Sequence, residues 1–487
     1  MSLTTVAELL ASAVDRFGDA PAVITTDWSE SFHELGERTR TVAADLLRRG
    51  LQPGDRVMMA ARNSPALVHL WLGTILAAGI PAPVNPELTE SEMDYLRADL
   101  QPRLSFVGDE VASIDADAAE SGTVQVPKPL PAREATAIVY TSGTTSRPKG
   151  VMVSDLAYSE SGFSFPGWIG LKPGHPQRLW ACLPLFHINA QAYSLMGALA
   201  YGYGLGLTPR FHASTFWRDA RALQVTEVNV VGAMLEFLAA QPQSTWVESP
   251  LRTIYAAPGP APAQRDELEA RFHVRIISGY AMTENPFGCI ESETSRAKAG
   301  SVGRPRQPKS RVWENQLRII NSTGDAVEPG EVGELTFRNP GITPGYWKAP
   351  EVTAATIKDG WLHTGDAGYR DEDGDVFLTG RYKEMIRRRG ENISPAEVED
   401  ALLAHPTVHA VAVFGVPAGL LEDEVLAAVV LRDGVAPDEA TLKAWMATRL
   451  AAYKVPSRIF YRDSLPMTPT HRVAKDVLRQ EYGRLTS

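Results

Sequence analysis

The run from Tyr140 to Gly150, YTSGTTSRPKG, has the composition of a loop that can bind a polyphosphate. Residues 141–146 are all small or hydroxyl-bearing, so backbone N–H groups can approach an anion closely and the hydroxyls add donors. Lys149 supplies positive charge. The spacing differs from the GxxxxGKS/T pattern of P-loop NTPases. A flexible surface loop rich in Ser, Thr and Gly has a similar composition, so this run alone leaves both interpretations open.

Together with five further strings in the same order, this run resembles the motifs of the adenylate-forming superfamily, which comprises acyl-CoA synthetases, peptide-synthetase adenylation domains and luciferases. The further strings are Gly279-Tyr-Ala-Met-Thr-Glu284, Gly333-Glu-Leu with Gly345-Tyr-Trp347, Gly360-Trp-Leu-His-Thr-Gly-Asp366, Gly380-Arg-Tyr-Lys383, and Tyr453-Lys-Val-Pro456 with residues 465–470. The resemblance covers essentially the whole chain and is nearest to stand-alone acyl-CoA ligases. Single residues of these strings would otherwise be interpreted as helix caps, turn residues or surface charges.

The resemblance implies an ATP site. Its phosphate contacts would come from one loop, with the residues Thr141, Ser142, Gly143, Thr144, Thr145 and Lys149. Glu284, beside Thr283, is implied to hold Mg²⁺ between the phosphates, and Tyr280 to pack against adenine. Asp366 is implied to accept both ribose hydroxyls, with Arg381 at the hinge as a second ribose ligand.

One catalytic position departs from the family pattern. Where the family has Gly and Lys after the last Thr of a TxT string, this chain has His471 and Arg472 after Thr470. The family lysine bridges the substrate and the α-phosphate. Arg keeps the charge but is bulkier and planar. Two interpretations stay open: Arg472 substitutes with some loss of rate, or its longer reach serves a very small acid or an altered acceptor step.

The acid pocket is also implied by resemblance. Within Phe186-His-Ile-Asn-Ala190, His187 is the best candidate for a gate residue, although a lone His is more often a packed side chain. Residues 231–234 and 285–288 would form other walls. None of the residues 231–234 is acidic and able to pair with an α-amino group, so the sequence does not favour an amino acid as the substrate.

The elements that must position these residues alternate between helical and β-rich sequence. Apolar spacing predicts helices at 7–16 and 32–49, and strands at 55–61, 80–84, 137–140, 179–183, 228–231, 253–256 and 274–278. Strands separated by helices predict largely parallel sheets with helices on both faces. After about residue 301, short strands between turns predict an antiparallel or barrel-like subdomain. The fold class is therefore α/β.

We expect two domains. Residues 1–380 would form a large N-terminal domain, with two parallel-rich sheets and the small barrel-like subdomain, that binds ATP and the acid. Residues 381–487 would form a small α+β C-terminal domain, with strands at 409–416 and 424–431 and a helix at 438–450. By resemblance this domain is a mobile catalytic lid that turns about the hinge.

Composition limits the alternatives. The 487 residues carry 48 Lys and Arg against 58 Asp and Glu, a net charge of −10, which argues against a nucleic-acid or anionic-membrane binder. Two distant cysteines, Cys182 and Cys289, favour neither a zinc site nor a disulfide framework. With no signal-peptide pattern at its start and no long apolar run, the chain is expected to be cytoplasmic. The sequence does not predict an oligomeric state.

The expected function is ATP-dependent, Mg²⁺-assisted activation of a small acid as its acyl-adenylate, with release of pyrophosphate and transfer to CoA. A first alternative keeps the adenylation but transfers the group to an amine, including activation of nitrite to diazotise an arylamine. A second alternative, motivated by Arg472, is a nucleotide-binding protein that has lost adenylation. The sequence identifies neither the acid nor the acceptor.

Overall fold

The computed structural model describes residues 5–120, 135–141, 148–171, 176–257, 259–260, 262–291, 298, 300–309, 313–321, 323–381, 386–388, 391–393, 395–418, 423–432, 434–436, 438–466, 473 and 475–483. The chain divides into two compact units. The first unit comprises Met1–Pro86, Leu100–Tyr140 and Gly150–Gly380. The second unit comprises Glu87–Asp99, Thr141–Lys149 and Arg381–Ser487.

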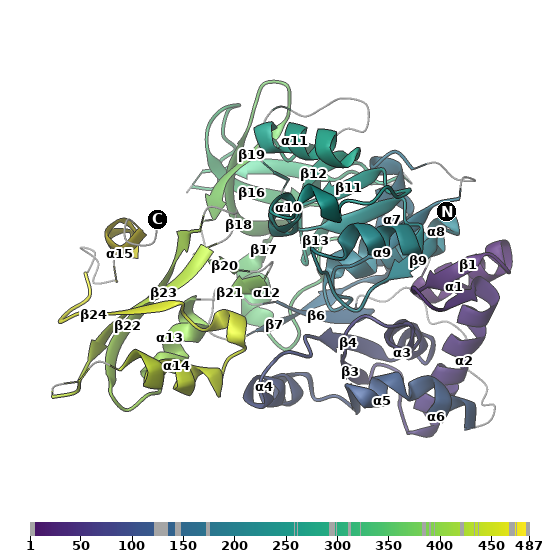
Figure 1. The fold of residues 1–487 in the computed structure, drawn as a ribbon, viewed down its shortest axis with the longest axis horizontal. Helices are drawn as coiled ribbons and strands as arrows, with labels where there is room; N and C mark the ends of the chain where they lie inside the picture. Colours follow the sequence, from purple (N-terminus) through teal and green to yellow (C-terminus); the bar gives the residue numbers. More distant parts are fainter. Residues whose placement is uncertain are drawn as a thin grey trace. The chain divides into compact units, whose positions relative to one another are not determined.

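The first unit is built around a nine-stranded sheet (Figure 1). Its order is β14 (Arg304–Pro305), β13 (Asn285–Ile290), β12 (Arg275–Met282), β11 (Thr253–Ala256), β10 (Glu227–Val230), β8 (Arg178–Ala181), β9 (Gly204–Leu207), β1 (Pro21–Ile24) and β2 (Ser29–Ser31). The six central strands run parallel to one another, as predicted: β12, β11, β10, β8, β9 and β1. The outer strands β13, β14 and β2 pair antiparallel.

Three smaller sheets complete the strands of this part of the chain. A parallel sheet has the order β4 (Ile80–Val84), β3 (Arg56–Ala60) and β5 (Leu104–Val107). Strands β6 (Ala137–Thr141) and β7 (Lys149–Val153) pair with each other. The subdomain predicted after residue 301 is an antiparallel sheet of β15 (Gln316–Ile320), β16 (Gly333–Arg338), β18 (Trp361–Arg370), β17 (Ile357–Lys358) and β19 (Val376–Arg381).

Helices surround these sheets, and several begin at sequence-encoded caps. Thr5 and Ser31 form capping boxes with Glu8 and Glu34, and Ser64 caps a helix that starts with a proline. The helical segments are α1 (Val6–Phe17), α2 (Phe32–Arg48), α3 (Pro65–Leu76), α5 (Asp109–Ala112), α6 (Ile114–Glu120), α7 (Asp155–Trp168), the π-helix η1 (Ala190–Leu195), α8 (Met196–Tyr201), α9 (Phe216–Leu223), α10 (Gly232–Ala239), η2 (Gln243–Thr245), α11 (Pro262–Phe272) and α12 (Pro350–Thr356).

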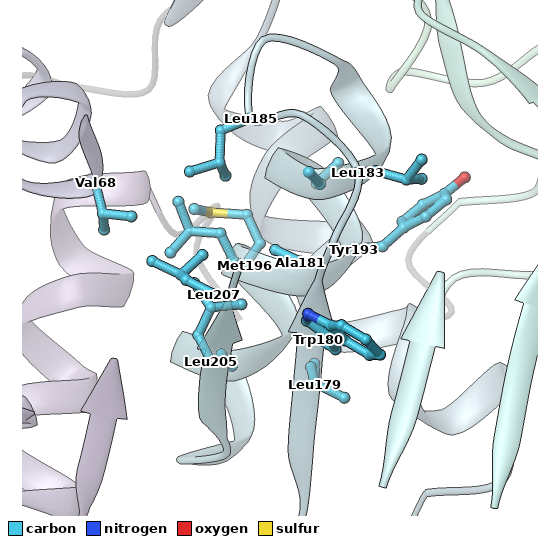
Figure 2. Close-up of a cluster of buried hydrophobic side chains, with 14 of the residues drawn as sticks. Val68, Leu179, Trp180, Ala181, Leu183, Leu185, Tyr193, Met196, Leu205 and Leu207 are labelled. Atoms are coloured by element: carbon cyan, nitrogen blue, oxygen red, sulfur yellow. The ribbon is translucent and has the colours of Figure 1, made fainter. Parts of the chain in front are cut away.

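The main core lies against the nine-stranded sheet. Figure 2 shows side chains of β8, β9, η1 and α8 packed together, among them Leu179, Trp180, Tyr193, Met196, Leu205 and Leu207. All six are buried. Because the strands of a parallel sheet are covered on both faces, they have near-continuous apolar sequence. Within the described residues, no helix is both long enough and apolar enough to cross a bilayer.

The second unit has its own core on a three-stranded sheet. Its elements are α4 (Glu90–Leu100, all but its last residue), β20 (Ile386–Arg388), β21 (Glu391–Ile393), α13 (Pro395–Leu403), β22 (Val408–Pro417), β23 (Asp423–Leu431), α14 (Glu439–Ala447), η3 (Ala452–Lys454), β24 (Arg458–Tyr461) and α15 (Lys475–Gly483). Strands β22 and β23 pair antiparallel, and β24 runs parallel to β23. This is the α+β pattern expected from the sequence.

Candidate active site

Asp366 and Tyr280 form a buried contact in the first unit. Tyr280 lies on β12 and donates a hydrogen bond of 2.6 Å from its hydroxyl to Oδ2 of Asp366 on β18. Each residue is only 9% exposed. The ring of Tyr280 stacks on Phe337, with centroids 6.1 Å apart. Two residues that the sequence assigned to one nucleoside site are therefore neighbours.

The orientation of Asp366 is determined by the strand around it. Its backbone N–H donates to Thr364 Oγ1 at 3.0 Å, and the Thr364 hydroxyl donates to the carbonyl of Leu335 at 2.7 Å. Glu334 accepts from the backbone N–H of Gly365 at 2.9 Å and lies 3.0 Å from Nδ1 of His363. Sequence reasoning assigned Glu334 no role, although it belongs to the Gly-Glu-Leu string.

Glu284 lies in the turn between β12 and β13, next to the half-buried Thr283. Its Oε1 accepts a hydrogen bond of 2.7 Å from the hydroxyl of Tyr346, and its carbonyl accepts one of 2.7 Å from the backbone N–H of Thr343. Glu284 is 8% exposed. Burial and the negative charge of Glu284 raise the pKa of Tyr346, so the phenol stays protonated and donates.

The segment Thr343–Trp347 also pairs with the strand that follows the hydroxyl-rich loop. Tyr346 forms an antiparallel bridge with Val151 of β7, and the N–H of Met152 donates to the carbonyl of Gly345 at 3.0 Å. The N–H of Trp347 donates to the carbonyl of Gly150 at 2.7 Å. One segment therefore contacts both Glu284 and the strand that begins at Lys149.

The phosphate loop itself is only partly described. Thr141 ends β6 and Lys149 begins β7, and both are half-buried. The predicted ligands between them, Ser142, Gly143, Thr144 and Thr145, lie outside the described residues. The strands on either side of these residues, β6 and β7, pair with each other.

The pocket residues are positioned by the segment between β8 and η1. Asn63 holds this segment, because its Nδ2 donates to the carbonyls of Ala181 at 3.1 Å and Leu183 at 2.9 Å. Its Oδ1 accepts from the N–H of Leu185 at 2.7 Å. His187 follows and is half-buried, with its ring centroid 4.6 Å from that of Phe186.

The wall at residues 285–288 is the strand β13. A buried amide network holds this strand: Asn339 Nδ2 donates to Oδ1 of Asn285 at 3.2 Å and to Oδ1 of Asn315 at 2.9 Å. The hydroxyl of Tyr193, on the π-helix, donates to the carbonyl of Pro286. Asn339 and Tyr193 thus each hold β13 from a different part of the chain. No sequence pattern indicated the π-helix.

The remaining predicted residues lie in the part of the second unit that begins at Arg381. Arg472 lies outside the described residues, and of Arg381 only its place at the end of β19 is described. Lys475, three positions after Arg472, pairs with Glu399 at 2.8 Å. Arg388, the middle one of three consecutive arginines, donates to the carbonyl of Val455 at 2.8 Å.

The described carboxylates fit a nucleotide with its metal. Asp366 is held by Tyr280, and a carboxylate with two oxygens can accept more than one hydroxyl donor, as a ribose offers. Among the described residues, no group of three or more His, Cys, Asp and Glu side chains could hold a metal ion. A site with fewer protein ligands, such as Glu284, suits Mg²⁺ because that ion takes one or two carboxylates plus substrate phosphates.

Comparison with known proteins shows the family of the chain. A family model described as AMP-binding enzyme matches residues 10–347, and one described as its C-terminal domain matches residues 397–472. The sulfoacetate–CoA ligase of Cupriavidus necator is 30% identical over 97% of this chain and 96% of its own. The oxalate–CoA ligase of Arabidopsis thaliana is 31% identical over 99% of each chain. An amide bond synthetase from Marinactinospora thermotolerans has 27% identity and a TM-score of 0.84, covering 97% of this chain and 99% of its own.

The family match spans most of the chain, and both the predicted fold class and the predicted superfamily are confirmed. The chain therefore belongs to the AMP-binding enzymes of the adenylate-forming superfamily, close to the acyl-CoA ligases, and is an ATP-dependent, AMP-forming ligase.

Proposed function

We propose that this enzyme activates a small acid with ATP and then transfers the acyl group to the thiol of CoA. The observation that carries the proposal is the segment Thr343–Trp347, which contacts both Glu284 and the strand beginning at Lys149. This arrangement supports Glu284 as a metal ligand that is held in place within the first unit. The buried Asp366–Tyr280 contact supports a nucleoside site in the same unit.

In the first half-reaction an oxygen of the substrate carboxylate attacks the α-phosphorus of ATP. The bond from that phosphorus to the bridging oxygen breaks, and pyrophosphate leaves with both electrons of the bond. Charge develops on the leaving group, so donors and cations aimed there lower the barrier. Lys149 and the hydroxyls of Thr141, Ser142, Thr144 and Thr145 are the proposed donors, and Glu284 would hold Mg²⁺.

The other predicted residues have separate tasks. Asp366 and Arg381 bind the ribose, and Tyr280 packs against the adenine. His187 gates the acid pocket, and Arg472 places a positive charge between the acid and the α-phosphate. In the second half-reaction the CoA thiol attacks the acyl carbon, its proton is released, and AMP leaves. Residues 1–380 bind ATP and the acid, and residues 381–487 form the catalytic lid.

An amine acceptor is the second candidate. The likeness to an amide bond synthetase favours it, because transfer to an amine shares the adenylation step and differs only in the nucleophile. The names of the relatives favour CoA, and several act on small acids. We therefore place CoA first and keep the amine as the alternative.

The decisive measurement is pyrophosphate release with a panel of small acids, with CoA, amines or no acceptor, followed by product mass. We expect release to require both ATP and an acid, and an acyl-CoA product. Asp366→Ala should weaken ATP binding by ~10–100-fold, because a hydrogen bond to a charged group contributes about 1.5–3 kcal/mol. Asp371→Asn is the matched control, since Asp371 pairs with Lys298 at the surface. No pyrophosphate with any acid would contradict adenylation.

A further inference from the structure

Tyr346 is held rigidly by its neighbours. Its backbone N–H donates to Thr353 Oγ1 at 2.9 Å, and it bridges to Val151 of β7. Gly345, just before it, has φ +147°, and a Cβ there would lie 2.7 Å from the side chain of Thr353. Glycine is therefore required at 345, and the backbone at Tyr346 has little freedom to move.

The side chain of Tyr346 contacts the carboxylate of Glu284. Its hydroxyl donates to Oε1 of Glu284 at 2.7 Å. Tyr346 is 8% exposed, so the contact is largely shielded from water. A hydrogen bond to an ionised acceptor is stronger than one between neutral groups. The pair Tyr346–Glu284 is therefore a fixed contact between a rigid segment and a flexible side chain.

Glu284 needs such a contact. A glutamate side chain has three rotatable bonds, and a carboxylate must hold one orientation to bind a cation that demands near-octahedral geometry. One hydrogen bond uses one of about four acceptor positions of a carboxylate, so donation by Tyr346 is compatible with cation binding. In known metal sites the groups that orient a ligand affect affinity strongly.

We propose that Tyr346 is a positioning residue for the metal ligand: its hydroxyl fixes the carboxylate of Glu284 where the cation of the nucleotide complex binds. The inference rests on the function proposed above and extends it. It also gives a task at this site to Tyr346 of the Gly-Tyr-Trp string, a residue to which the sequence assigned no role. The same segment positions β7, so the metal ligand and the strand after the phosphate loop share one support.

The test is calorimetry of ATP binding over a series of Mg²⁺ concentrations and in EDTA, with wild type and Tyr346→Phe. Loss of an orienting group typically costs ~10–100-fold in metal affinity. We therefore expect the Mg²⁺ concentration that gives half of the full Mg²⁺ effect on ATP affinity to rise ~10–100-fold in Tyr346→Phe. The ATP affinity measured in EDTA should stay within about twofold of the wild-type value. Phe fills the same space, so the melting temperature of the free protein should change little.

Two other tyrosine variants serve as controls, and a double-mutant cycle with Glu284 isolates the effect of the Tyr346 hydroxyl. Tyr369→Phe, on β18 in the same unit, should leave ATP binding unchanged, because Tyr369 stacks on Phe377 through its ring. Tyr280→Phe should weaken ATP binding equally with and without Mg²⁺, because its hydroxyl meets Asp366. In a Glu284→Gln background, Tyr346→Phe should have no further effect on the Mg²⁺ dependence.

The possible outcomes separate the inference from the function. If wild type shows Mg²⁺-dependent binding and Tyr346→Phe keeps it, the inference is wrong and the proposed function stands. If Tyr346→Phe loses affinity equally in Mg²⁺ and EDTA, Tyr346 has only a structural role and the inference is again wrong. If wild type binds no ATP at any Mg²⁺ concentration, both proposals fail.

Discussion

Glu227, at the start of β10, is fully buried without compensation from the described part of the chain. Its side chain is 0% exposed, and neither carboxylate oxygen has a hydrogen-bond partner among the described residues. Burial therefore raises the pKa of Glu227 well above that of a free carboxyl. The folded protein holds the proton, whereas the unfolded chain releases it above about pH 4.5. Stability must fall as the pH rises from that point.

Glu227→Gln removes this dependence, because an amide has no proton to lose. We expect the free energy of unfolding of the variant to exceed that of wild type by an amount that grows with pH above 4.5, at roughly 1.4 kcal/mol per pH unit until the folded pKa is reached. Denaturant unfolding of both proteins from about pH 5 to about pH 8 measures this difference in the free energy of unfolding. A difference that is constant with pH would contradict the prediction.

At the residue scale, the sequence singled out the named polar residues but not the residues that hold them in place. Asp366, Tyr280 and Glu284 stand in strings whose order identified the superfamily, and Asp366 and Tyr280 are in contact. Tyr346 and Glu334 stand in equally specific strings, but their partners lie 62 and 29–31 positions away. Only the fold brings such pairs together, so no local pattern indicated these contacts.

At the scale of elements, His69 ties α3 to two other segments. Its Nε2 lies 2.8 Å from Glu30 of β2, and its Nδ1 lies 2.8 Å from Asp115 of α6. Burial alone lowers the pKa of His69, but the hydrogen bonds of Asp115 and Glu30 outweigh it and raise the pKa to about 9. The folded protein therefore keeps an imidazolium here at neutral pH.

This protonation stabilises the packing of α3 on its neighbours up to a definite pH. The contribution is fully present below the unfolded pKa of 6.5 and is lost as the pH rises towards 9. Since each pKa unit is equivalent to about 1.4 kcal/mol, the loss is on the order of 3 kcal/mol. The free energy of unfolding of His69→Gln should be lower than that of wild type at neutral pH, and it should change less as the pH rises. A wild-type slope that survives in the variant would contradict the assignment.

Elements with clear apolar patterns were predicted almost to the residue, and others were missed. The strands at 80–84 and 253–256 are found as predicted, because buried parallel strands have strong local patterns. Strand β13, Asn285–Ile290, has the sequence NPFGCI, which lacks a β-rich pattern and forms a strand by pairing with β12 and β14. The π-helix η1 likewise has no sequence signal of its own.

At the scale of the whole molecule, the proposed reaction requires residues 381–487 to supply a cation to the acid and the α-phosphate. Arg472→Lys restores the residue type of the family at this position. We expect faster pyrophosphate release with ordinary acids if Arg472 is a slower substitute, because a compact ammonium suits a crowded site. Single-turnover assays with the acid panel measure this. Loss of activity would instead assign Arg472 to a specialised acid or acceptor.

The sequence indicated a change of pattern near Gly380, but it could not predict which distant segments form one unit. Lys454 is buried and lies 2.8 Å from both Glu92 and Glu397. Glu92 is 362 positions away in the chain. Buried charges are tolerated when they are paired, and these ion pairs join α4 to η3 and α13. No local sequence motif indicates which residues pair over such a distance in the chain.

The pairing of β7 with Thr343–Trp347 has a consequence for folding during synthesis of the chain. The hydroxyl of Thr343 meets the carbonyl of Met152 across 191 positions of chain. A ribosome adding roughly 5–20 residues per second delivers the partner of β7 about 10–40 seconds after β7 itself. During that interval β7 lacks the segment that also donates a hydrogen bond to Glu284. These contacts therefore form only late in translation.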